Sequence, residues 1–328
     1  MRAVIVTEPG GPEKLSIGAI DEPSPGPGEA LVRLRAAGVN RADLLQRMGL
    51  YPPPPGVRAD VLGLEFAGEI ARLGEGVSDF LPGDRVMGIA SGAAQAELLV
   101  APLRMLLPIP RQLSFEEAAA IPEAFLTAHD ALVTQAGLAL GEAVLVHAVT
   151  SGVGTAALQL ARAAGATVLG SSRSAEKLER ARALGLETGV LVGADGRFAE
   201  RVVAATRGRG ADVVVDLVGA SYLAETTRAM AEGGRLVAVG LLGGAKAELD
   251  LGRLLAKRLR LFGTTLRARP PEEKARVTQR FWREAWPLFD RGVLRPVVDR
   301  AFPLEEVRAA HERMARGEHF GKIVLTIG

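Results

Sequence analysis

The segment Val144–Leu160 constrains the fold of this chain more than any other part of the sequence. It reads as a buried strand, a turn of small residues and the start of a helix. The free N–H groups and partial positive charge of a helix N-terminus suit a pyrophosphate, and Gly152 and Gly154 allow close approach of the backbone. An intact G-x-G-x-x-G is absent, because Val149 and Ser151 stand where the first two glycines would be. The strand–turn–helix context nevertheless predicts a dinucleotide-binding turn. Its residues are Ser151, Gly152, Val153 and Gly154.

Strands and helices alternate after about residue 123. Strands are expected at Ala143–His147, Thr167–Gly170, Asp212–Val215 and Arg235–Val239, and helices at Gly154–Ala164, Ala175–Leu184 and near Tyr222–Met230. This alternation predicts an α/β fold with a doubly wound parallel sheet. Ligands gather at the carboxyl ends of the strands in such sheets. Gly240, Leu241 and Gly243, which follow the fourth strand, are therefore further candidates for cofactor binding.

The end of the second strand bears on which nicotinamide cofactor is bound. NAD enzymes usually carry an acidic residue about 20 residues after the glycines, where it bonds the ribose hydroxyls. Here the strand ends in Leu169-Gly-Ser-Ser-Arg-Ser, without an acid. Ser172, Arg173 and Lys177 could instead surround a 2′-phosphate, which favours NADPH over NADH. The alternative is that Arg173 and Lys177 form an ordinary solvated face.

The first 120 or so residues predict a different kind of structure. Short apolar runs, at Ala3–Val6, Ala30–Leu34 and Gly68–Leu73, are separated by Pro and Gly clusters, which indicates an irregular, β-rich domain. After about residue 265 the strand–helix alternation stops. Helices are expected near Pro271–Phe289 and Leu304–Arg316, followed by a strand at Lys322–Ile327.

Composition excludes several classes of site. The chain has no cysteine, and its histidines (His129, His147, His311 and His319) show no ligand spacing, so no metal is expected. We interpret His147 as a strand residue and His311 as a helix residue. A net charge of +2 and few aromatic residues count against nucleic-acid binding. The uncharged stretch Ala143–Ala161 contains glycines and polar residues, so we expect no membrane span and a cytoplasmic protein.

Short motifs run in order along nearly the whole chain. They are Ala37–Leu44, Gly49–Gly56, Leu62–Gly68, Pro82–Val86, Ala120–Ala128, Ser151–Ala157, Gly240–Gly244 and Gly321–Leu325. In this order they resemble the zinc-independent quinone oxidoreductases of the medium-chain dehydrogenase/reductase superfamily, and most nearly the p53-inducible quinone oxidoreductase branch. The resemblance implies three segments. These are a GroES-like catalytic domain at 1–122, a Rossmann NADP-binding domain at 123–264 and a C-terminal return to the catalytic domain at 265–328.

The resemblance also bears on the missing metal. Zinc-dependent alcohol dehydrogenases of the superfamily place Cys, His and Cys where this chain has Asn40, Leu64 and Glu123. Leucine cannot bind zinc and asparagine binds it poorly, so three protein ligands are not available. Without this Lewis acid, reduction of an already electrophilic acceptor is expected in place of alcohol oxidation.

The family's active site lies between its two domains, and the resemblance carries three catalytic-site roles onto this chain. Asn40 would lie near the nicotinamide or its ribose, and Thr127 would bond the cofactor. Tyr51, next to a run of four prolines, would stack on the acceptor or donate a hydrogen bond to its carbonyl group.

Further cofactor contacts are implied in the same way. Leu266, with its neighbour Thr265, would hold the carboxamide through backbone groups. Lys322 would either reach a cofactor phosphate or form a surface salt bridge. Close relatives carry a tyrosine near the adenine where Val192 stands here, and loss of that contact would weaken cofactor binding.

The activity implied is hydride transfer from NADPH to a quinone or similarly conjugated carbonyl acceptor, and the sequence shows no evident acid–base dyad to assist it. One alternative is NADPH-dependent reduction of an enone or enal double bond. Another is a non-catalytic NADPH- or RNA-binding protein. A strand after Gly240 and the apolar stretch Leu249–Leu255 are expected at the sheet edge, where relatives pair, which implies a homodimer or homotetramer.

Overall fold

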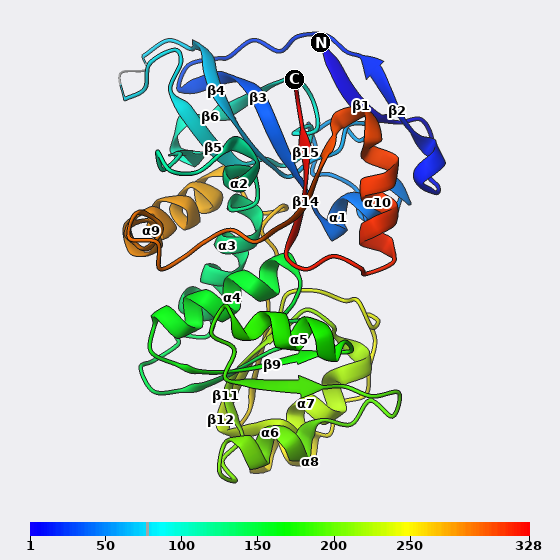
Figure 1. Ribbon diagram of the computed structural model, residues 1–328, viewed down its shortest axis with the longest axis vertical. Coiled ribbons are helices and arrows are strands. Elements are labelled where there is room, and N and C mark those ends of the chain that lie inside the picture. Colours follow the sequence, from blue (N-terminus) through cyan, green and yellow to red (C-terminus); the bar gives the residue numbers. More distant parts are fainter. Residues whose placement is uncertain (77–78) are drawn as a thin grey trace. The chain divides into compact units, whose positions relative to one another are not determined.

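The computed structural model describes residues 1–76 and 79–328. The chain divides into two compact units (Figure 1). The first consists of Met1–Leu126 and Leu266–Gly328, and the second is the continuous stretch Thr127–Thr265. Within the described residues, no helix has the length and apolar character needed to cross a bilayer.

Antiparallel strands dominate the first unit. Its strands are β1 (Arg2–Val6), β2 (Leu15–Ala19), β3 (Glu29–Val39), β4 (Glu65–Leu73), β5 (Arg85–Ile89), β6 (Leu98–Pro102), β7 (Leu106–Pro108), β14 (Val298–Pro303) and β15 (Lys322–Thr326). β1 pairs with β2, and the other strands form a sheet in the order β14-β15-β3-β4-β5-β7, with β6 also paired to β3. The long strand β3 therefore joins the N-terminal segment to the C-terminal strand β15, which lies antiparallel to it.

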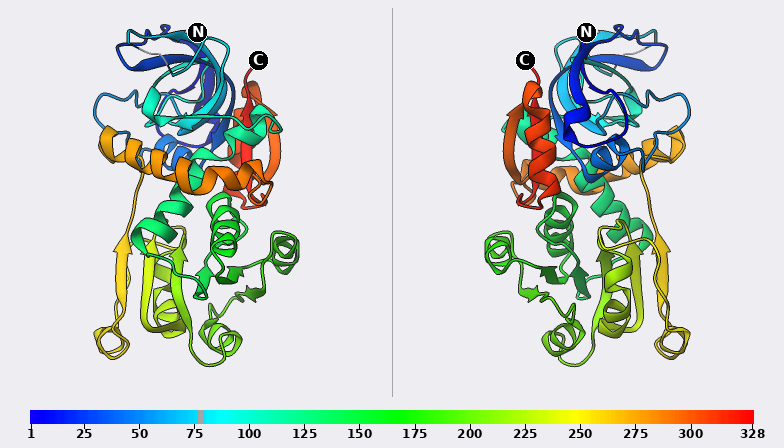
Figure 2. Two further views of the ribbon diagram at one scale, coloured as in Figure 1. Left: turned by 90° about the vertical axis from the view of Figure 1, so that its left-hand side faces the viewer. Right: turned by 90° about the vertical axis from the view of Figure 1, so that its right-hand side faces the viewer.

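Helices cover this sheet and close its core. They are α1 (Arg41–Arg47), α2 (Phe115–Ala119), α3 (Pro122–His129), α9 (Pro271–Asp290) and α10 (Val307–Ala315), with 3₁₀ turns η1 (Pro12–Lys14), η2 (Leu103–Met105) and η5 (Leu304–Glu306). α9 packs on η2 and β7, and α10 packs on β15 and η1 (Figure 2). Leu34, Phe66 and Ile323, from the adjacent strands β3, β4 and β15, are buried in one core cluster, and polar side chains described below lie at the ends of these strands.

The second unit contains a six-stranded sheet in which every pair of neighbours is parallel. Its strands are β8 (Ala143–Val146), β9 (Thr167–Ser172), β10 (Thr188–Leu191), β11 (Ala211–Asp216), β12 (Met230–Ala238) and β13 (Arg260–Gly263). The order is β10-β9-β8-β11-β12-β13, so the direction of winding reverses at β8. This confirms the predicted doubly wound sheet and places its switch point, where ligands bind in such folds, at the end of β8.

Helices lie on both faces of this parallel sheet. They are α4 (Gly152–Ala163), α5 (Ala175–Arg182), α6 (Ala199–Ala205), α7 (Leu223–Ala229) and α8 (Leu251–Ala256), with a π-helical turn η3 (Asp130–Gln135) and a 3₁₀ turn η4 (Ala220–Tyr222). α4 and α5 cover one face, and α6, α7 and α8 cover the other (Figure 1). The sequence analysis missed β10 and α6 and did not assign the apolar stretch at α8 to a helix. β10 is a four-residue edge strand, and α6 and α8 are helices of seven and six residues, so none has enough length to show a clear period.

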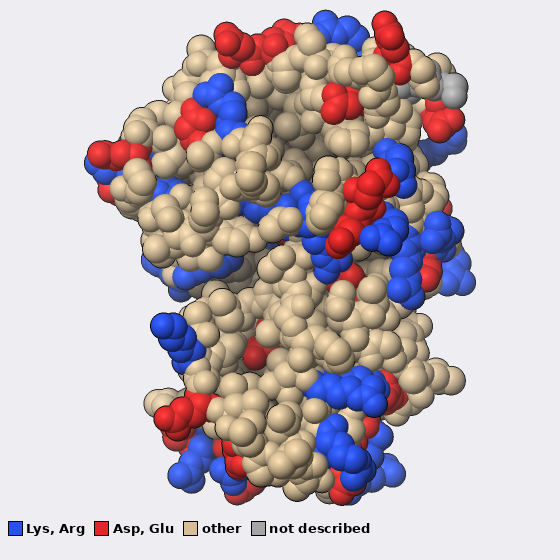
Figure 3. All heavy atoms as spheres, turned by 180° about the vertical axis from the view of Figure 1, so that it is seen from behind, with Lys and Arg blue, Asp and Glu red and all other residues tan. Residues whose placement is uncertain are grey.

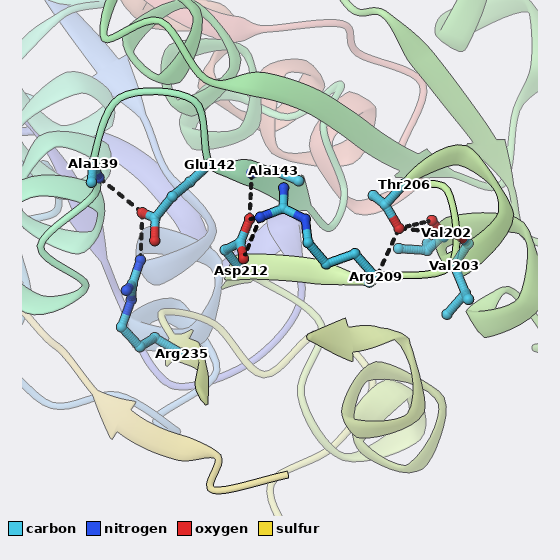
Figure 4. Close-up of polar contacts among 10 residues, drawn as sticks. Ala139, Glu142, Ala143, Val202, Val203, Thr206, Arg209, Asp212 and Arg235 are labelled. Carbon is cyan, nitrogen blue, oxygen red and sulfur yellow. Dashed lines mark hydrogen bonds and ion pairs between the residues drawn. The ribbon is translucent and has the colours of Figure 1, made fainter. Parts of the chain in front are cut away.

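Ion pairs link the strands of the parallel sheet at their amino-terminal ends (Figure 4). Glu142, just before β8, pairs with Arg235 of β12 at 2.5 Å. Asp212 of β11 accepts a hydrogen bond from the N–H of Ala143 at 2.7 Å and pairs with Arg209 at 2.9 Å. These contacts tie β8, β11 and β12 together at the end opposite to the glycine turn.

Charge of both signs is present on one face of the molecule. On the face shown in Figure 3, Lys and Arg side chains lie among Asp and Glu side chains. This face therefore does not present a field of one sign, in keeping with the net charge of +2 for the whole chain.

Candidate functional site

The turn between β8 and α4 has the local geometry of an anion-binding helix start. Ser151 is the N-cap of α4, and its Oγ accepts a hydrogen bond from the N–H of Gly154 at 3.1 Å. A Cβ on Gly154 would overlap the backbone of Ala148 and Val149, so only glycine lets the helix pack this closely on the turn. The partly exposed first-turn residues Ser151, Gly152 and Val153 fit a pyrophosphate through helix N–H groups.

A second polar group follows β9. The Oγ of Ser172 accepts from the N–H of Ser174, and the Oγ of Ser174 accepts from the N–H of Lys177, both at 3.2 Å. Ser174 is thus the N-cap of α5, and it brings Ser172, Arg173 and Lys177 into one turn of chain. Arg173 is exposed, and Ser172 and Lys177 are partly exposed. A hydroxyl, a guanidinium and an ammonium group in this arrangement suit a phosphate monoester.

Two loops meet beyond β11 and β12. Asp216 ends β11, and its Oδ1 accepts from the N–H groups of Val218 and Gly219 at 2.7 and 3.0 Å. The N–H of Gly240 donates to the carbonyl of Asp216, and that of Gly243 to the carbonyl of Val218. Burial raises the pKa of the Asp216 carboxyl group. The predicted residues Gly240, Leu241 and Gly243 therefore form a loop held against the end of β11.

A buried histidine lies beneath this edge of the sheet. His147 comes directly after β8 and is not within it, although its N–H donates to Val215 and continues the ladder. Its ring nitrogens lie 2.8 Å from the Ser171 hydroxyl and 2.9 Å from the Thr226 hydroxyl. Burial lowers the pKa of His147 to about 3, so the imidazole is neutral near pH 7. It holds the ends of β8 and β9 to α7.

Aromatic rings pack around this histidine. Phe198 and Tyr222 lie edge-on to it, with ring centroids 5.0 and 5.1 Å away. Burial raises the pKa of Tyr222, and the charge of Arg173 acts in the opposite direction, which places the phenol near the predicted phosphate group. Val192 is buried, and its N–H donates to the Ser172 carbonyl at 2.9 Å. The sequence analysis did not assign Tyr222 to the site. The feature that could have drawn attention to it is the rarity of tyrosine, since the chain has two.

In the first unit, Asn40, Glu65 and Lys322 form a hydrogen-bonded group. The Asn40 Nδ2 donates to Glu65 Oε1 at 2.8 Å, and its Oδ1 accepts from Lys322 Nζ at 2.6 Å. Lys322 also forms an ion pair with Glu65 at 2.5 Å and donates to the carbonyl of Val39. Lys322 is 4% exposed, so the salt bridge suggested by the sequence is a buried one and not a surface one. Three oxygen atoms thus surround its ammonium group.

Two further carboxyl groups adjoin this group. The N–H of Glu123 donates to Glu65 Oε2 at 2.8 Å. Burial, and then the charge of Glu65, raise the pKa of Glu123 to about 8. Asp43 is fully buried and accepts from the N–H groups of Asn40 and Gly63, and burial raises its pKa to about 6. The sequence analysis missed Glu65 and Asp43, although Glu65 stands in the otherwise apolar run Leu62–Gly68.

The residues at the positions of a catalytic zinc do not fit that metal. Leu64 is buried and offers no donor atom, and the Asn40 amide is bonded to Glu65 and Lys322. An ammonium group already occupies the neighbourhood of these oxygen atoms. Over the described residues, no group of three or more His, Asp or Glu could hold a metal ion.

Tyr51 is held by an arginine that the sequence analysis also missed. The Arg267 guanidinium lies 5.2 Å from the centroid of the Tyr51 ring and donates to its carbonyl at 3.3 Å. The same guanidinium donates to the Ser91 carbonyl at 2.8 Å and to the Gln46 side chain at 2.5 Å. Lys274 of α9 donates to the Ser91 hydroxyl. Burial raises the pKa of Tyr51. The ring is thus fixed against a cation within the first unit.

The predicted residues therefore fall into two groups. The second unit holds the turn at Ser151–Gly154, the group after β9 and the loop after β12, together with Thr127 near the end of α3. The first unit holds Asn40, Tyr51 and Lys322, together with the buried Leu266 that precedes Arg267. Asn40 and Lys322 are in direct contact, whereas Tyr51 belongs to the separate network around Arg267.

Comparison with known proteins identifies relatives for both units. Residues 26–111 match the family model described as alcohol dehydrogenase GroES-like domain, and residues 152–283 match zinc-binding dehydrogenase. The quinone oxidoreductase of Rattus norvegicus is 31% identical over 333 residues, covering 100% of this chain and 98% of that protein. The spectinabilin polyketide synthase system protein NorB of Streptomyces orinoci is 37% identical over 302 residues. That match covers 92% of this chain but 13% of the synthase, so the chain spans a small part of this longer relative.

Solved structures agree with the whole chain in fold. An NAD-dependent alcohol dehydrogenase matches with a TM-score of 0.89 at 35% identity, covering 100% of both chains. A mycobacterial protein complexed with NADPH matches with a TM-score of 0.90 at 29% identity, also covering 100% of both. The CurK enoyl reductase matches with a TM-score of 0.88 at 28% identity, covering 100% of this chain and 99% of that one.

Proposed function

Since the chain belongs to the medium-chain dehydrogenase/reductase superfamily of oxidoreductases, we propose that it reduces a quinone or a related conjugated carbonyl compound with NADPH. The observation that carries this proposal is the set of donors at the carboxyl edge of the parallel sheet. A capped glycine turn offers N–H groups at the end of β8, and Ser172, Arg173 and Lys177 offer a hydroxyl and two cations at the end of β9.

In this proposal the residues of the second unit bind the nucleotide. Ser151, Gly152, Val153 and Gly154 bind the pyrophosphate at the start of α4. Ser172, Arg173 and Lys177 bind the 2′-phosphate, which NADPH has and NADH lacks. Gly240, Leu241 and Gly243, with Thr127, orient the nicotinamide end. When bound, the cofactor supplies a hydride equivalent to the acceptor.

The choice of NADPH over NADH rests on charge. Similar structures include an NAD-dependent enzyme and a protein complexed with NADPH, so the fold serves both. An NAD site needs an acceptor for the ribose hydroxyls, usually a carboxylate at the end of the second strand. Here that strand ends at Ser172 and is followed by Arg173, and an arginine favours a phosphate.

Residues of the first unit would receive the acceptor. Tyr51 offers the face of its ring for stacking on a flat conjugated molecule and a phenol for a hydrogen bond to its carbonyl oxygen. Arg267 fixes that ring in one orientation. Asn40 acts as a positioning residue, because both ends of its amide are bonded to Glu65 and Lys322.

The test is oxidation of NADPH by the purified full chain with an ortho-quinone, a para-quinone and an α,β-unsaturated ketone, with NADH as the control cofactor. Fast turnover of a quinone with NADPH and slow turnover with NADH is the expected result. Equal rates with both cofactors would contradict the phosphate site. No turnover of any acceptor would contradict the reductase activity.

A second candidate is reduction of the carbon–carbon double bond of an enone or enal. The match to the CurK enoyl reductase and to a polyketide synthase system protein favours it. Product analysis distinguishes the two activities, because a saturated ketone indicates double-bond reduction and a hydroquinone indicates quinone reduction.

Self-association is part of the same proposal. β13 is an edge strand of the parallel sheet, and the helix that precedes it, α8, has two leucines with exposed side chains. They are Leu251 and Leu255. An exposed edge with apolar neighbours suits pairing with a second copy of the chain. Light scattering is expected to give a dimer or a tetramer, and a monomer at micromolar concentration would contradict this.

A further inference from the structure

Glu123 differs from the other carboxylates around it. It lies in the first turn of α3, where its N–H donates to Glu65 Oε2. Asp43 and Glu65 are fully buried, whereas Glu123 is partly exposed. Of these three residues, Glu123 is therefore the one that a molecule approaching the cluster from outside can contact.

The charged groups facing Glu123 come from several elements. Glu65 of β4 and Asp43 of α1 repel its ionised form, and Lys322 of β15 and Arg267 attract it. Lys274 of α9 and Tyr51 also interact with its charge.

The nearby cations are bonded to other groups. The ammonium of Lys322 forms an ion pair with Glu65 and donates hydrogen bonds to Asn40 and Val39. The guanidinium of Arg267 donates hydrogen bonds to Gln46, Ser91 and Tyr51. Burial and the negative charge of Glu65 thus outweigh the attraction of these two cations, and the pKa of Glu123 is raised to about 8. At neutral pH its carboxyl group is mostly protonated and can donate a hydrogen bond, which a carboxylate cannot.

We propose that Glu123 is the proton donor of the reaction, transferring its carboxyl proton to the oxygen of the conjugated acceptor that becomes anionic on reduction. This rests on the proposed reductase function. Reduction adds a hydride to the acceptor and leaves a negative oxygen, either of a hydroquinone monoanion or of an enolate. The O–H bond of Glu123 breaks, its electron pair stays on the carboxylate, and a new O–H bond forms on the acceptor. Water then returns a proton to Glu123, so each turnover consumes one proton from solvent.

The requirement for this proton depends on the acceptor. A hydroquinone anion is stabilised by resonance and can take its proton from water, whereas an enolate is a stronger base. Replacing a general acid typically lowers the rate by about 10² to 10⁴. We therefore expect Glu123→Gln to lower kcat for an enone by about 100-fold and for a quinone much less. With the enone, kcat of the unmodified protein is expected to fall as pH rises through about 8, and this dependence is expected to disappear in the variant.

The matched control is Glu116→Gln. Glu116 is a partly exposed glutamate in the neighbouring helix α2 and is not one of the groups that interact with Glu123. This variant is expected to keep the rates and the pH profile of the unmodified protein. Thermal unfolding of both variants checks that each is folded, and Glu123→Asp, which keeps a titratable group, serves if Glu123→Gln does not fold.

A measurement that needs neither cofactor nor acceptor tests the proton directly. Infrared difference spectra of the full chain between pH 6 and pH 10 are expected to show the carbonyl band of a protonated carboxyl group disappearing near pH 8. The component that disappears near pH 8 is expected to be absent in Glu123→Gln and present in Glu116→Gln, whereas a component from Asp43 is expected to disappear near pH 6 in both variants.

The outcomes separate this proposal from the proposed function. If the protein reduces acceptors but the band is missing, or Glu123→Gln keeps the enone rate and its pH profile, the proton-donor role alone is overturned. If the unmodified protein reduces no acceptor, the reductase function is overturned and the proton-donor role with it. A titrating band together with a selective loss of enone turnover supports both.

Discussion

The ammonium of Lys322 lies 2.5 Å from the carboxylate of Glu65, and both side chains are almost completely buried. Lys322 begins β15 and Glu65 begins β4, so this pair joins the C-terminal strand to the middle of the first sheet. Removing one partner of a buried ion pair leaves an uncompensated charge in the interior.

We expect Lys322→Ala to lower the free energy of unfolding by about 3 to 5 kcal/mol. Urea unfolding followed by circular dichroism measures this. Arg258→Ala is the control, because Arg258 pairs with Glu232 while about 70% of both side chains is exposed. Its effect is expected to be about 0 to 1 kcal/mol. If the free energy of unfolding falls equally in the two variants, the buried pair contributes no more to stability than the exposed one.

Gly38 of β3 leaves the space that the Glu65 side chain fills. A Cβ at position 38 would overlap the carboxyl group of Glu65, which cannot move freely because Lys322 and Asn40 bond to it. We expect Gly38→Ala to destabilise the fold by about 1 to 3 kcal/mol. Gly263→Ala in β13 is the control, since no atom lies within 4 Å of its added Cβ. Thermal unfolding of the two variants makes the comparison, and a Gly38→Ala midpoint no lower than the control's would contradict the prediction.

Arg173 carries the clearest prediction about the cofactor. We expect Arg173→Ala to raise KM for NADPH by about 10- to 100-fold, the equivalent of one charge-assisted hydrogen bond, and to leave KM for NADH nearly unchanged. Arg182→Ala is the control, because Arg182 ends α5 and pairs with Glu179 on the surface. A parallel loss for both cofactors would assign Arg173 to the structure of the loop and not to a phosphate.

Tyr51 is expected to act on the acceptor. Tyr51→Phe keeps the ring against Arg267 and is expected to reduce turnover modestly. Tyr51→Ala removes the stacking surface and is expected to raise KM for a quinone about 10-fold. Leu50→Ala, at the neighbouring exposed position, controls for disturbance of the loop. Steady-state kinetics that show Tyr51→Ala unchanged would remove Tyr51 from the site.

The buried imidazole of His147 predicts a loss of stability in acid. Its pKa is lowered from 6.5 to about 3 in the folded chain, so the unfolded chain binds a proton more readily. The contribution of His147 to stability is therefore complete above about pH 6.5 and is lost as the pH falls toward 3. Glu123 has the opposite effect, because its raised pKa makes stability fall as pH rises from 4.5 to about 8.

The pH dependence of stability due to His147 can be separated from that due to Glu123 by comparing the unmodified protein with a variant that lacks the histidine. Urea unfolding of the unmodified protein and of His147→Gln across this pH range isolates the histidine. The stability difference between them is expected to shrink as pH falls below 6.5. A constant difference would mean that His147 is not buried as a neutral ring.

The sequence predicted the parallel sheet well, because its evidence is local. The turn at Ser151–Gly154 lies directly between a buried strand and an amphipathic helix, and the apolar runs of β8 and β11 have few interruptions. β10 was missed because a four-residue edge strand, Thr188–Leu191, with a glycine inside it, has too little pattern to be distinguished from a loop.

The cluster in the first unit could not be predicted in the same way. Asn40 and Lys322 are 282 residues apart in the chain and are brought together by the pairing of β3 with β15. Resemblance to a family drew attention to both residues, but not to their contact. Arg267 and Glu65 appear in the sequence as ordinary charges, and only burial shows that each is bonded to several partners.

The ion pairs of Glu142 with Arg235 and of Asp212 with Arg209 stabilise the edge of the sheet opposite to the glycine turn. Substitutions at Ser172, Arg173 or Lys177 leave those pairs intact. Under the proposed assignment of these three residues to the 2′-phosphate, the sheet can tolerate changes in cofactor preference with little loss of foldability. Because the stabilising ion pairs and the proposed cofactor-binding residues lie at opposite edges of the sheet, a new cofactor specificity can evolve at one edge while the other edge preserves the fold.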